Sequence, residues 1–215
     1  MKGATGRWWR RERRALLLLP IALIAVLAAS GSRVDEYWWS RGFHEKAEIV
    51  DGWAQIEDEY DDGHLTYPIR AELTLDSVRP VEGVPGAAFG TKVAKGGQLW
   101  EIKLRWKADP NVSLVGCNLA LFDADGVRYD AGPTGWDASS AGLADKCLPV
   151  GTAGPRPVLG STEPPRLSEF EEPRPEAWQS TAYALTKSGA KPVAVRVWYF
   201  LPRYVELPVG SSTRG

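Results

Sequence analysis

A basic cluster followed by an uninterrupted apolar run constrains this chain more than any other feature. Residues 7–14 read Arg-Trp-Trp-Arg-Arg-Glu-Arg-Arg, and the 18 residues between Arg14 and Arg33 carry no charge. A membrane-spanning helix needs about 17–25 mostly apolar residues, and the basic flank stays in the cytoplasm. The sequence therefore predicts a cytoplasmic basic tail (1–14), a transmembrane helix or signal-anchor (15–32) in the lipid bilayer of the plasma membrane, and an extracytoplasmic remainder.

Tryptophan pairs on both sides of the apolar run favour a retained single-pass anchor. Trp9 and Trp38 are 29 residues apart, which is about 43 Å of continuous helix at about 1.5 Å per residue. A bilayer with its headgroups is about 40–45 Å thick, and tryptophan concentrates at both of its surfaces. The alternative is a secretory signal cleaved after Ser30, since Ala28 and Ala29 precede it. Both alternatives place the rest of the chain outside the cytoplasm.

The exported part is mildly acidic. Residues 1–14 hold six basic residues and one acidic residue, which leaves 20 basic and 26 acidic residues in the rest of the chain, a net charge of −6. Nucleic-acid-binding domains concentrate positive charge on one face. The composition therefore argues against a nucleic acid as partner.

Cys117 and Cys147 are the only cysteines. An even count in an exported protein predicts a disulfide, which would stabilise the fold by about 3.6 kcal/mol in the chain-entropy model. Two buried free thiols are the alternative. A zinc site would lack ligands, because no histidine lies near either cysteine, and the sequence predicts no metal ligand and no cofactor.

Residues 33–65 form a polar linker in this interpretation, with the acidic run 57–63 as a solvated loop. Beyond it the pattern changes to a period of two, which is typical of half-buried strands. We expect strands at 66–76, 99–107, 114–122, 127–129, 178–185 and 193–201, with a short edge at 204–207. In the second of these, Trp100, Ile102, Leu104 and Trp106 share one face. Asp123 and Asp125 belong to a hairpin turn with Gly126.

Strands separated by turns, with no helical period after Ser40, predict an all-β fold, an immunoglobulin-like antiparallel β-sandwich over residues 66–207. Residues 208–215 are expected to be a disordered tail. Residues 131–177 contain many prolines, which block both ladder and helix hydrogen bonds, and are expected to form a long loop. Trp136 is the candidate binding residue of this loop, and the sequence leaves open whether it is exposed or packed over the sheet edge.

The segment Leu119–Tyr129, a leucine-rich strand that ends in Asp-Ala-Asp-Gly-Val-Arg-Tyr, resembles the telokin-like, immunoglobulin-like β-sandwich domains of exported and membrane-anchored actinobacterial proteins. The resemblance extends over about residues 66–207, and its specific part is this one hairpin. It implies a fold and an exported location. The family has no shared catalytic residues, and this chain departs from it by its proline-rich insertion and its cysteines.

These features predict a binding or assembly module with an envelope protein as partner. A rigid β-scaffold that carries a long loop commonly places recognition on that loop. One alternative is an accessory subunit whose transmembrane helix pairs with another helix through Ala22, Ala25, Ala28 and Ala29. An exported hydrolase is the other, but the only histidines, His44 and His64, lie in the linker, and no known catalytic motif is present. The sequence thus predicts a protein that is not an enzyme and has no catalytic residue.

Overall fold

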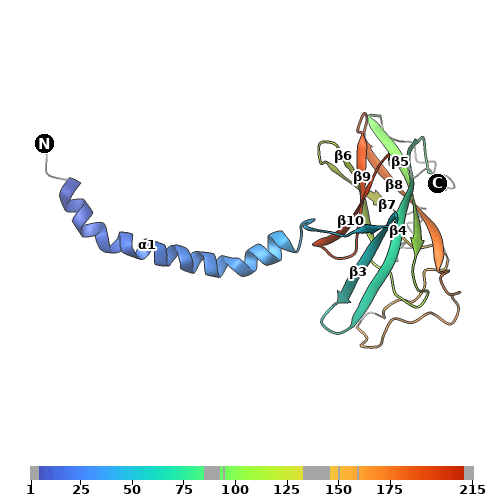
Figure 1. The fold of residues 1–215 in the computed structure, drawn as a ribbon, viewed down its shortest axis with the longest axis horizontal. Coiled ribbons are helices and arrows are strands. Elements are labelled where there is room, and N and C mark those ends of the chain that lie inside the picture. The colour runs from blue at the N-terminus through green and yellow to red at the C-terminus, as the bar shows by residue number, and fades with distance from the viewer. Residues whose placement is uncertain are drawn as a thin grey trace. The chain divides into compact units, whose positions relative to one another are not determined.

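The computed structural model describes residues 5–84, 93, 95–132, 146–149, 151–158 and 160–210 (Figure 1). The chain divides into two compact units, Met1–Gly42 and Phe43–Gly215. The first is helical and the second is built from strands. The prediction of an all-β fold after the N-terminal segment is confirmed.

The helical unit consists of α1 (Thr5–Val34) and a π-helical end, η1 (Asp35–Trp39). The Ser40 hydroxyl donates to the carbonyl of Glu36 at 2.6 Å and satisfies one of the last carbonyls. Arg41 stacks on Tyr37, 5.1 Å from the ring centre. The apolar run is therefore helical throughout and continues past Gly31. In the part of the chain that the structure describes, no helix combines the length and the apolarity of a membrane span.

The second unit contains ten described strands. They are β1 (Glu45–Lys46), β2 (Ile49–Val50), β3 (Trp53–Asp61), β4 (Thr66–Val81), β5 (Gly97–Lys107), β6 (Asn118–Asp123), β7 (Arg128–Gly132), β8 (Ala177–Lys187), β9 (Pro192–Trp198) and β10 (Arg203–Pro208).

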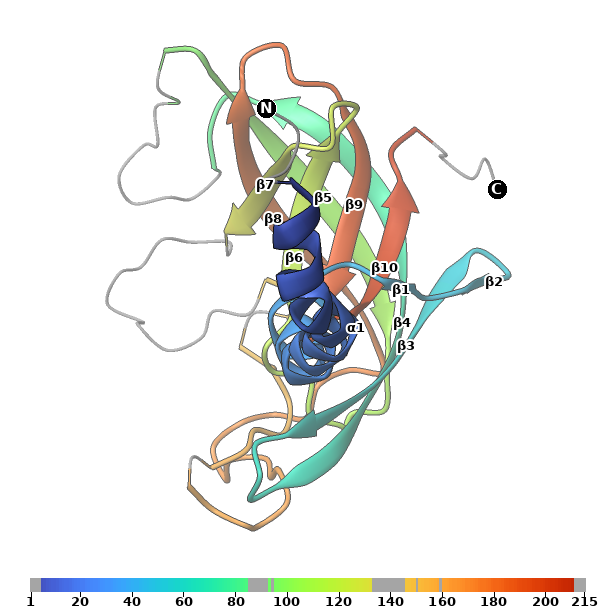
Figure 2. The same ribbon diagram turned by 90° about the vertical axis from the view of Figure 1, so that its left-hand side faces the viewer.

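These strands form one sheet in the order β1-β10-β9-β6-β7-β8-β5-β4-β3-β2. The pairs are antiparallel except β1 with β10. β7 joins the two halves of the sheet, because it pairs with β6 and, at Ala131 and Gly132, with β8. Leu104 of β5 and Val197 of β9 belong to the same buried cluster. The sheet therefore curves so that its halves face each other across one core (Figure 2).

The predicted strands are confirmed with small changes at their ends. On β5, Ile102, Leu104 and Trp106 are buried in the core and Trp100 packs against it from the edge, as the period of two indicates. β4 continues to Val81, beyond the expected end at residue 76, because a bulge between Leu75 and Ser77 shifts the register without ending the pairing. At such a bulge the alternation of apolar and polar residues in the sequence stops, although the strand continues.

The prediction of a polar linker over residues 33–65 is wrong for its second half. Residues 45–61 contain β1, β2 and β3, and the β unit begins at Phe43, not at residue 66. On β3, Ala54 and Ile56 are buried and pair with β4. Carboxylates at five of the six positions 57–62 conceal this alternation, because a strand at a sheet edge keeps charged side chains on its solvent face.

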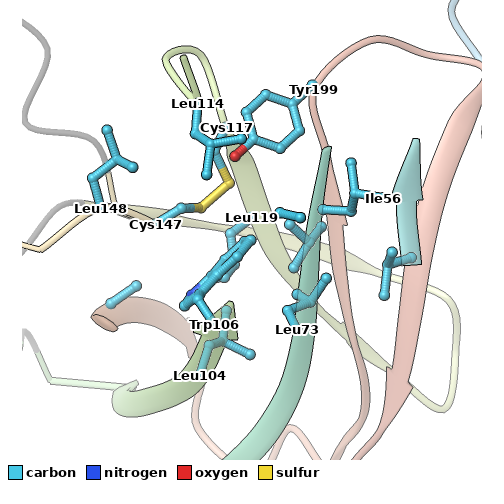
Figure 3. Packing of buried hydrophobic residues seen from close by; sticks show 14 of the residues in the cluster. Ile56, Leu73, Leu104, Trp106, Leu114, Cys117, Leu119, Cys147, Leu148 and Tyr199 are labelled. Atoms are coloured by element: carbon cyan, nitrogen blue, oxygen red, sulfur yellow. A yellow bond between two sulfur atoms is a disulfide. The ribbon is translucent and has the colours of Figure 1, made fainter. Parts of the chain in front are cut away.

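Trp106 and the disulfide lie at the centre of the core (Figure 3). Cys117 and Cys147 are bonded, with their Cα atoms 6.1 Å apart, so the predicted pairing is confirmed. Leu114, Leu119 and Leu148 pack around them. The bridge ties the segment before β6 to the segment 146–149, which returns over the core from the long loop.

A smaller apolar cluster covers the outer face of β6, β9 and β10. Phe43 makes edge-to-face contacts with Phe122, Trp198 and Tyr204, at ring-centre distances of 5.0–5.6 Å. The Arg196 guanidinium lies 4.2 Å from the centre of the Phe122 ring and pairs with Glu206. These contacts fix the first residue of the β unit against the sheet, which leaves residues 40–42 between η1 and Phe43.

Candidate functional site

The long loop that sequence analysis placed at 131–177 runs from the end of β7 to the start of β8. Its described parts are residues 146–149, 151–158 and 160–176. The later part, drawn in orange, lies at the end of the β unit where β3 turns into β4 (Figure 2). Trp136, the predicted binding residue, is outside the described residues.

A fully buried arginine holds the end of this loop in place. Arg174 is 1% exposed, and its two terminal nitrogens donate to the carbonyls of Ala153 (3.2 Å), Asp109 (2.7 Å) and Val112 (2.8 Å). These acceptors come from the loop itself and from the turn after β5. Burial lowers the pKa of Arg174. The nearby Tyr199 and Asp109 raise this pKa, but their influence is smaller than that of burial. Arg174 thus links three chain segments that are distant in sequence.

Gly154 allows the loop to pass against this arginine. Its φ of +84° lies in the left-handed region that favours glycine. A Cβ at this position would lie 3.0 Å from the Arg174 Nη1 atom and 3.3 Å from its Cβ. Both the backbone conformation and the close approach therefore require the residue that has no side chain.

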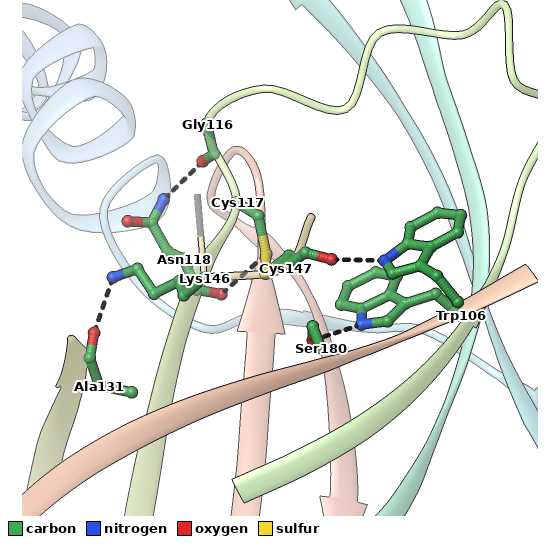
Figure 4. Close-up of a disulfide and its surroundings, with 9 residues drawn as sticks. Trp106, Gly116, Cys117, Asn118, Ala131, Lys146, Cys147 and Ser180 are labelled. Atoms are coloured by element: carbon green, nitrogen blue, oxygen red, sulfur yellow. Dashed lines mark hydrogen bonds between the residues drawn. A yellow bond between two sulfur atoms is a disulfide. The ribbon is translucent and has the colours of Figure 1, made fainter. Parts of the chain in front are cut away.

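Two stacked tryptophans lie between the Arg174 side chain and the disulfide, and Figure 4 shows the stacked rings beside the disulfide. Arg174 lies over the Trp178 ring, 5.0 Å from its centre. Trp178 stacks on Trp106 with ring centres 6.0 Å apart and an interplanar angle of 3°. The Trp178 indole N–H donates to the Cys147 carbonyl at 2.8 Å, and that of Trp106 donates to Ser180 at 2.9 Å. The base of the loop is therefore part of the core.

On this fixed base the described part of the loop carries an exposed aromatic side chain. Phe170 is 96% exposed, in a turn closed by the Glu171 N–H, which donates to the Ser168 carbonyl at 3.1 Å. Glu169 and Glu172 lie beside it in the sequence and are exposed. Sequence analysis selected Trp136 in this loop and not Phe170. A phenylalanine between carboxylates was the signal that it missed.

The residues considered as ligands or catalysts lie in structural positions. The Asp123 carboxylate accepts the N–H groups of Asp125 and Val127 and the Tyr129 hydroxyl, which confirms the hairpin turn. His64 occupies the turn between β3 and β4, where its N–H donates to Asp62. Among the described residues, no three histidine, cysteine, aspartate or glutamate side chains are close enough together to hold a metal ion.

Glu101 is a buried carboxylate on the outer face of β5. It accepts a hydrogen bond from Arg79 Nε at 2.7 Å, lies 3.7 Å from Lys103 Nζ, and accepts the Tyr183 hydroxyl at 3.4 Å. The Arg79 hydrogen bond is the strongest influence and lowers the pKa of Glu101, whereas desolvation raises it. The folded state therefore favours the ionised carboxylate.

This lowered pKa predicts an acid-dependent loss of stability. The contribution of Glu101 is complete above the ordinary pKa of glutamate and is lost as the pH falls through the lowered pKa. We expect Glu101→Gln to unfold more easily at neutral pH and to give a shallower acid limb than the wild type in urea titrations. Glu72→Gln, which removes a half-buried carboxylate 4.0 Å from Lys107, is the control and should change little, because this ion pair is solvated. Parallel acid limbs for wild type and Glu101→Gln would contradict this assignment.

The β unit belongs to the class of all-β domains with one internal disulfide. Comparison of the chain with protein-family models, with curated proteins and with solved structures gave no match in any of the three.

Proposed function

We propose that this protein is a single-pass, membrane-anchored extracytoplasmic binding or assembly module, whose β unit is an immunoglobulin-like sandwich and recognises an envelope protein through the loop that carries Phe170. The observation that carries the proposal is an almost fully exposed aromatic side chain on a loop whose base is held by the buried Arg174. Large, rigid aromatic anchors dominate the binding energy of protein interfaces.

The strand order supports the immunoglobulin-like part of the proposal. If β4 to β10 are taken in chain order as strands A to G, β4-β5-β8-β7 gives the order A-B-E-D, and β6-β9-β10 gives C-F-G. These are the two sheets of a constant-type immunoglobulin domain. Several features depart from it, among them the short strands β1 and β2 at the two edges. β3 extends the first sheet, β7 also pairs with β6, and the disulfide does not join strands B and F.

The surface of α1 supports the anchor. From Leu18 to Leu27 its large apolar side chains are 55–65% exposed within this chain. A helix that is apolar on all sides requires an apolar environment, and the hydrocarbon region of a bilayer supplies one. The Cys117–Cys147 bond supports the extracytoplasmic location of the β unit, because disulfides persist in oxidising compartments. Alkaline carbonate extraction of membranes tests whether the chain is anchored. Digestion of intact cells with an added protease, which cannot cross the membrane, tests whether the β unit lies outside.

Phe170 provides a direct test of the binding role. We expect Phe170→Ala to leave the free energy of unfolding within about 0.5 kcal/mol of the wild type, because an exposed side chain contributes little to folding. Capture of the partner should fall about 30-fold, which corresponds to about 2 kcal/mol for an interface hot spot. The measurement is site-specific photocrosslinking of the full chain in cells, with the photoreactive residue at position 170.

Val158 gives a matched control, since it is 47% exposed in the same loop. A photoreactive residue there should give no adduct or a much weaker one. A discrete adduct from position 170 that disappears when Glu169 and Glu172 are changed to lysine would support recognition by a basic surface. If adducts form only from positions within residues 15–32, the loop-recognition proposal fails and the accessory-subunit alternative replaces it.

A further inference from the structure

One edge of the sheet is only partly covered. β2 pairs with β3 at Trp53 and Ala54 alone. No other strand that the structure describes pairs with the rest of this side of β3, residues 55–61. We call this side the β3 edge. An uncovered edge is a template for a further strand, because its backbone N–H and C=O groups have no ladder partner.

Two hydrogen bonds show which residues present their backbone at the β3 edge. The Gln55 N–H donates to the Glu48 carbonyl at 3.2 Å, and the Glu57 carbonyl accepts from Arg203 Nη1 at 3.2 Å. In an antiparallel strand the N–H and C=O of one residue point to the same side, and the side alternates along the chain. Glu57 and Glu59 therefore direct their backbone groups away from β4.

A groove of about 500 Å³ runs beside the β3 edge. This volume lies within the range of about 300–1,000 Å³ that is usual for ligand sites. The crossing segment 45–50 forms one wall, and residues 55–58 of β3 form another. The third consists of residues 197–199 and 203–205 at the ends of β9 and β10. Ile56 and Val205 contribute apolar surface, and Glu48 and Glu57 contribute carboxylates.

The charge at the groove is negative and unpaired. Glu48, Glu57 and Glu59 are exposed and form no ion pair with any described residue. The two cations of the groove are already engaged, since Lys46 pairs with Glu206 at 2.8 Å and Arg203 with Glu45 at 3.1 Å. A second copy of this chain would bring the same carboxylates to the edge and be repelled. A segment with lysine or arginine side chains complements the site.

We propose that the β3 edge captures an extended, basic segment of another protein by strand addition. The backbone of that segment pairs with the Glu57 N–H and the Glu59 carbonyl, because the Glu59 N–H already donates to Asp58 Oδ1 at 2.9 Å and the Glu57 carbonyl already accepts from Arg203. One of its basic side chains enters the groove between Glu48 and Glu57. Main-chain hydrogen bonds supply affinity in this mode of recognition, and alternate side chains supply specificity. The site is separate from the Phe170 loop and does not depend on the function proposed for that loop.

The test uses three fluorescent seven-residue peptides and the full chain in detergent. The first alternates threonine and lysine, the second alternates threonine and glutamate, and the third is the lysine peptide with alternate backbone nitrogens methylated. Fluorescence anisotropy should show saturable binding of the lysine peptide and at least tenfold weaker binding of the other two. Absence of binding by the lysine peptide overturns the proposal. Equal binding of the methylated peptide also overturns it, since only non-specific charge attraction would then remain.

Two variants at one position separate the backbone from the charge. Glu57→Pro removes the N–H at the β3 edge and leaves the β4 ladder intact, because that N–H points away from β4; we expect at least a tenfold loss of lysine-peptide affinity. Glu57→Gln keeps the N–H and should cost only a few-fold, with a weaker dependence on salt. Unchanged affinity in Glu57→Pro overturns strand addition. If Glu57→Pro does not fold, as judged by circular dichroism, the comparison of the lysine peptide with its methylated form decides whether binding occurs by strand addition.

Discussion

Replacing Arg174 with methionine is expected to lower the free energy of unfolding by about 4 kcal/mol. The substitution keeps most of the side-chain volume but removes every donor. The carbonyls of Ala153, Asp109 and Val112 then lose their partner, and hydrogen bonds to a charged group contribute about 1.5–3 kcal/mol each. The desolvation cost of the guanidinium, which is no longer incurred, offsets part of this sum. A lysine has one nitrogen for three acceptors, so Arg174→Lys should recover only a part of the free energy of unfolding that Arg174→Met loses.

Urea denaturation of the full chain, followed by near-ultraviolet circular dichroism of the stacked Trp106 and Trp178, measures this effect. Arg166 provides the control, because it lies in the same loop but is 69% exposed and forms a single ion pair with Glu163. Arg166→Met should change the free energy of unfolding by less than about 0.5 kcal/mol. If Arg174→Met is as stable as Arg166→Met, then Arg174 does not hold the base of the loop.

The sequence predicts strands well where one face is apolar and the other polar. On β5, Trp100, Ile102, Leu104 and Trp106 alternate with charged residues. This pattern predicts a strand with one face in the core, and the structure confirms it. β3 was missed because its core face offers only Ala54, Ile56 and Tyr60 among five acidic or amide side chains. Its pairing with β4 is a tertiary contact, which local composition does not report.

The candidate sites, too, could be predicted only where the local sequence reports them. The disulfide could be predicted because a chain with two cysteines permits one pairing within itself. Arg174 could not, since an arginine between prolines gives no sign that three carbonyls from two other segments converge on it. The groove beside β3 also depends on chain segments about 150 residues apart, such as Glu57 and Arg203. Sites made by convergence of distant segments require the fold itself.

Removal of the disulfide is expected to destabilise the β unit by about 3.6 kcal/mol. The two cysteines are separated by 30 residues, and the chain-entropy model gives this value for a loop of that length. The segment 146–149 would lose its covalent tie, although the Cys147 carbonyl still accepts the Trp178 indole N–H. Leu148 packs in the core beside the bridge, so the double variant Cys117→Ala with Cys147→Ala should also loosen this side of the core.

Urea unfolding of the wild type and of the double variant, each with and without dithiothreitol, tests this expectation and carries its own control. Dithiothreitol should shift the wild-type midpoint to that of the double variant and should leave the double variant unchanged, because only the wild type contains a bond to reduce. A double variant within about 1 kcal/mol of the oxidised wild type would contradict the chain-entropy value. A loss well above that value would mean that the segment 146–149 detaches, because Leu148 and the Cys147–Trp178 hydrogen bond would then be lost together with the covalent bond.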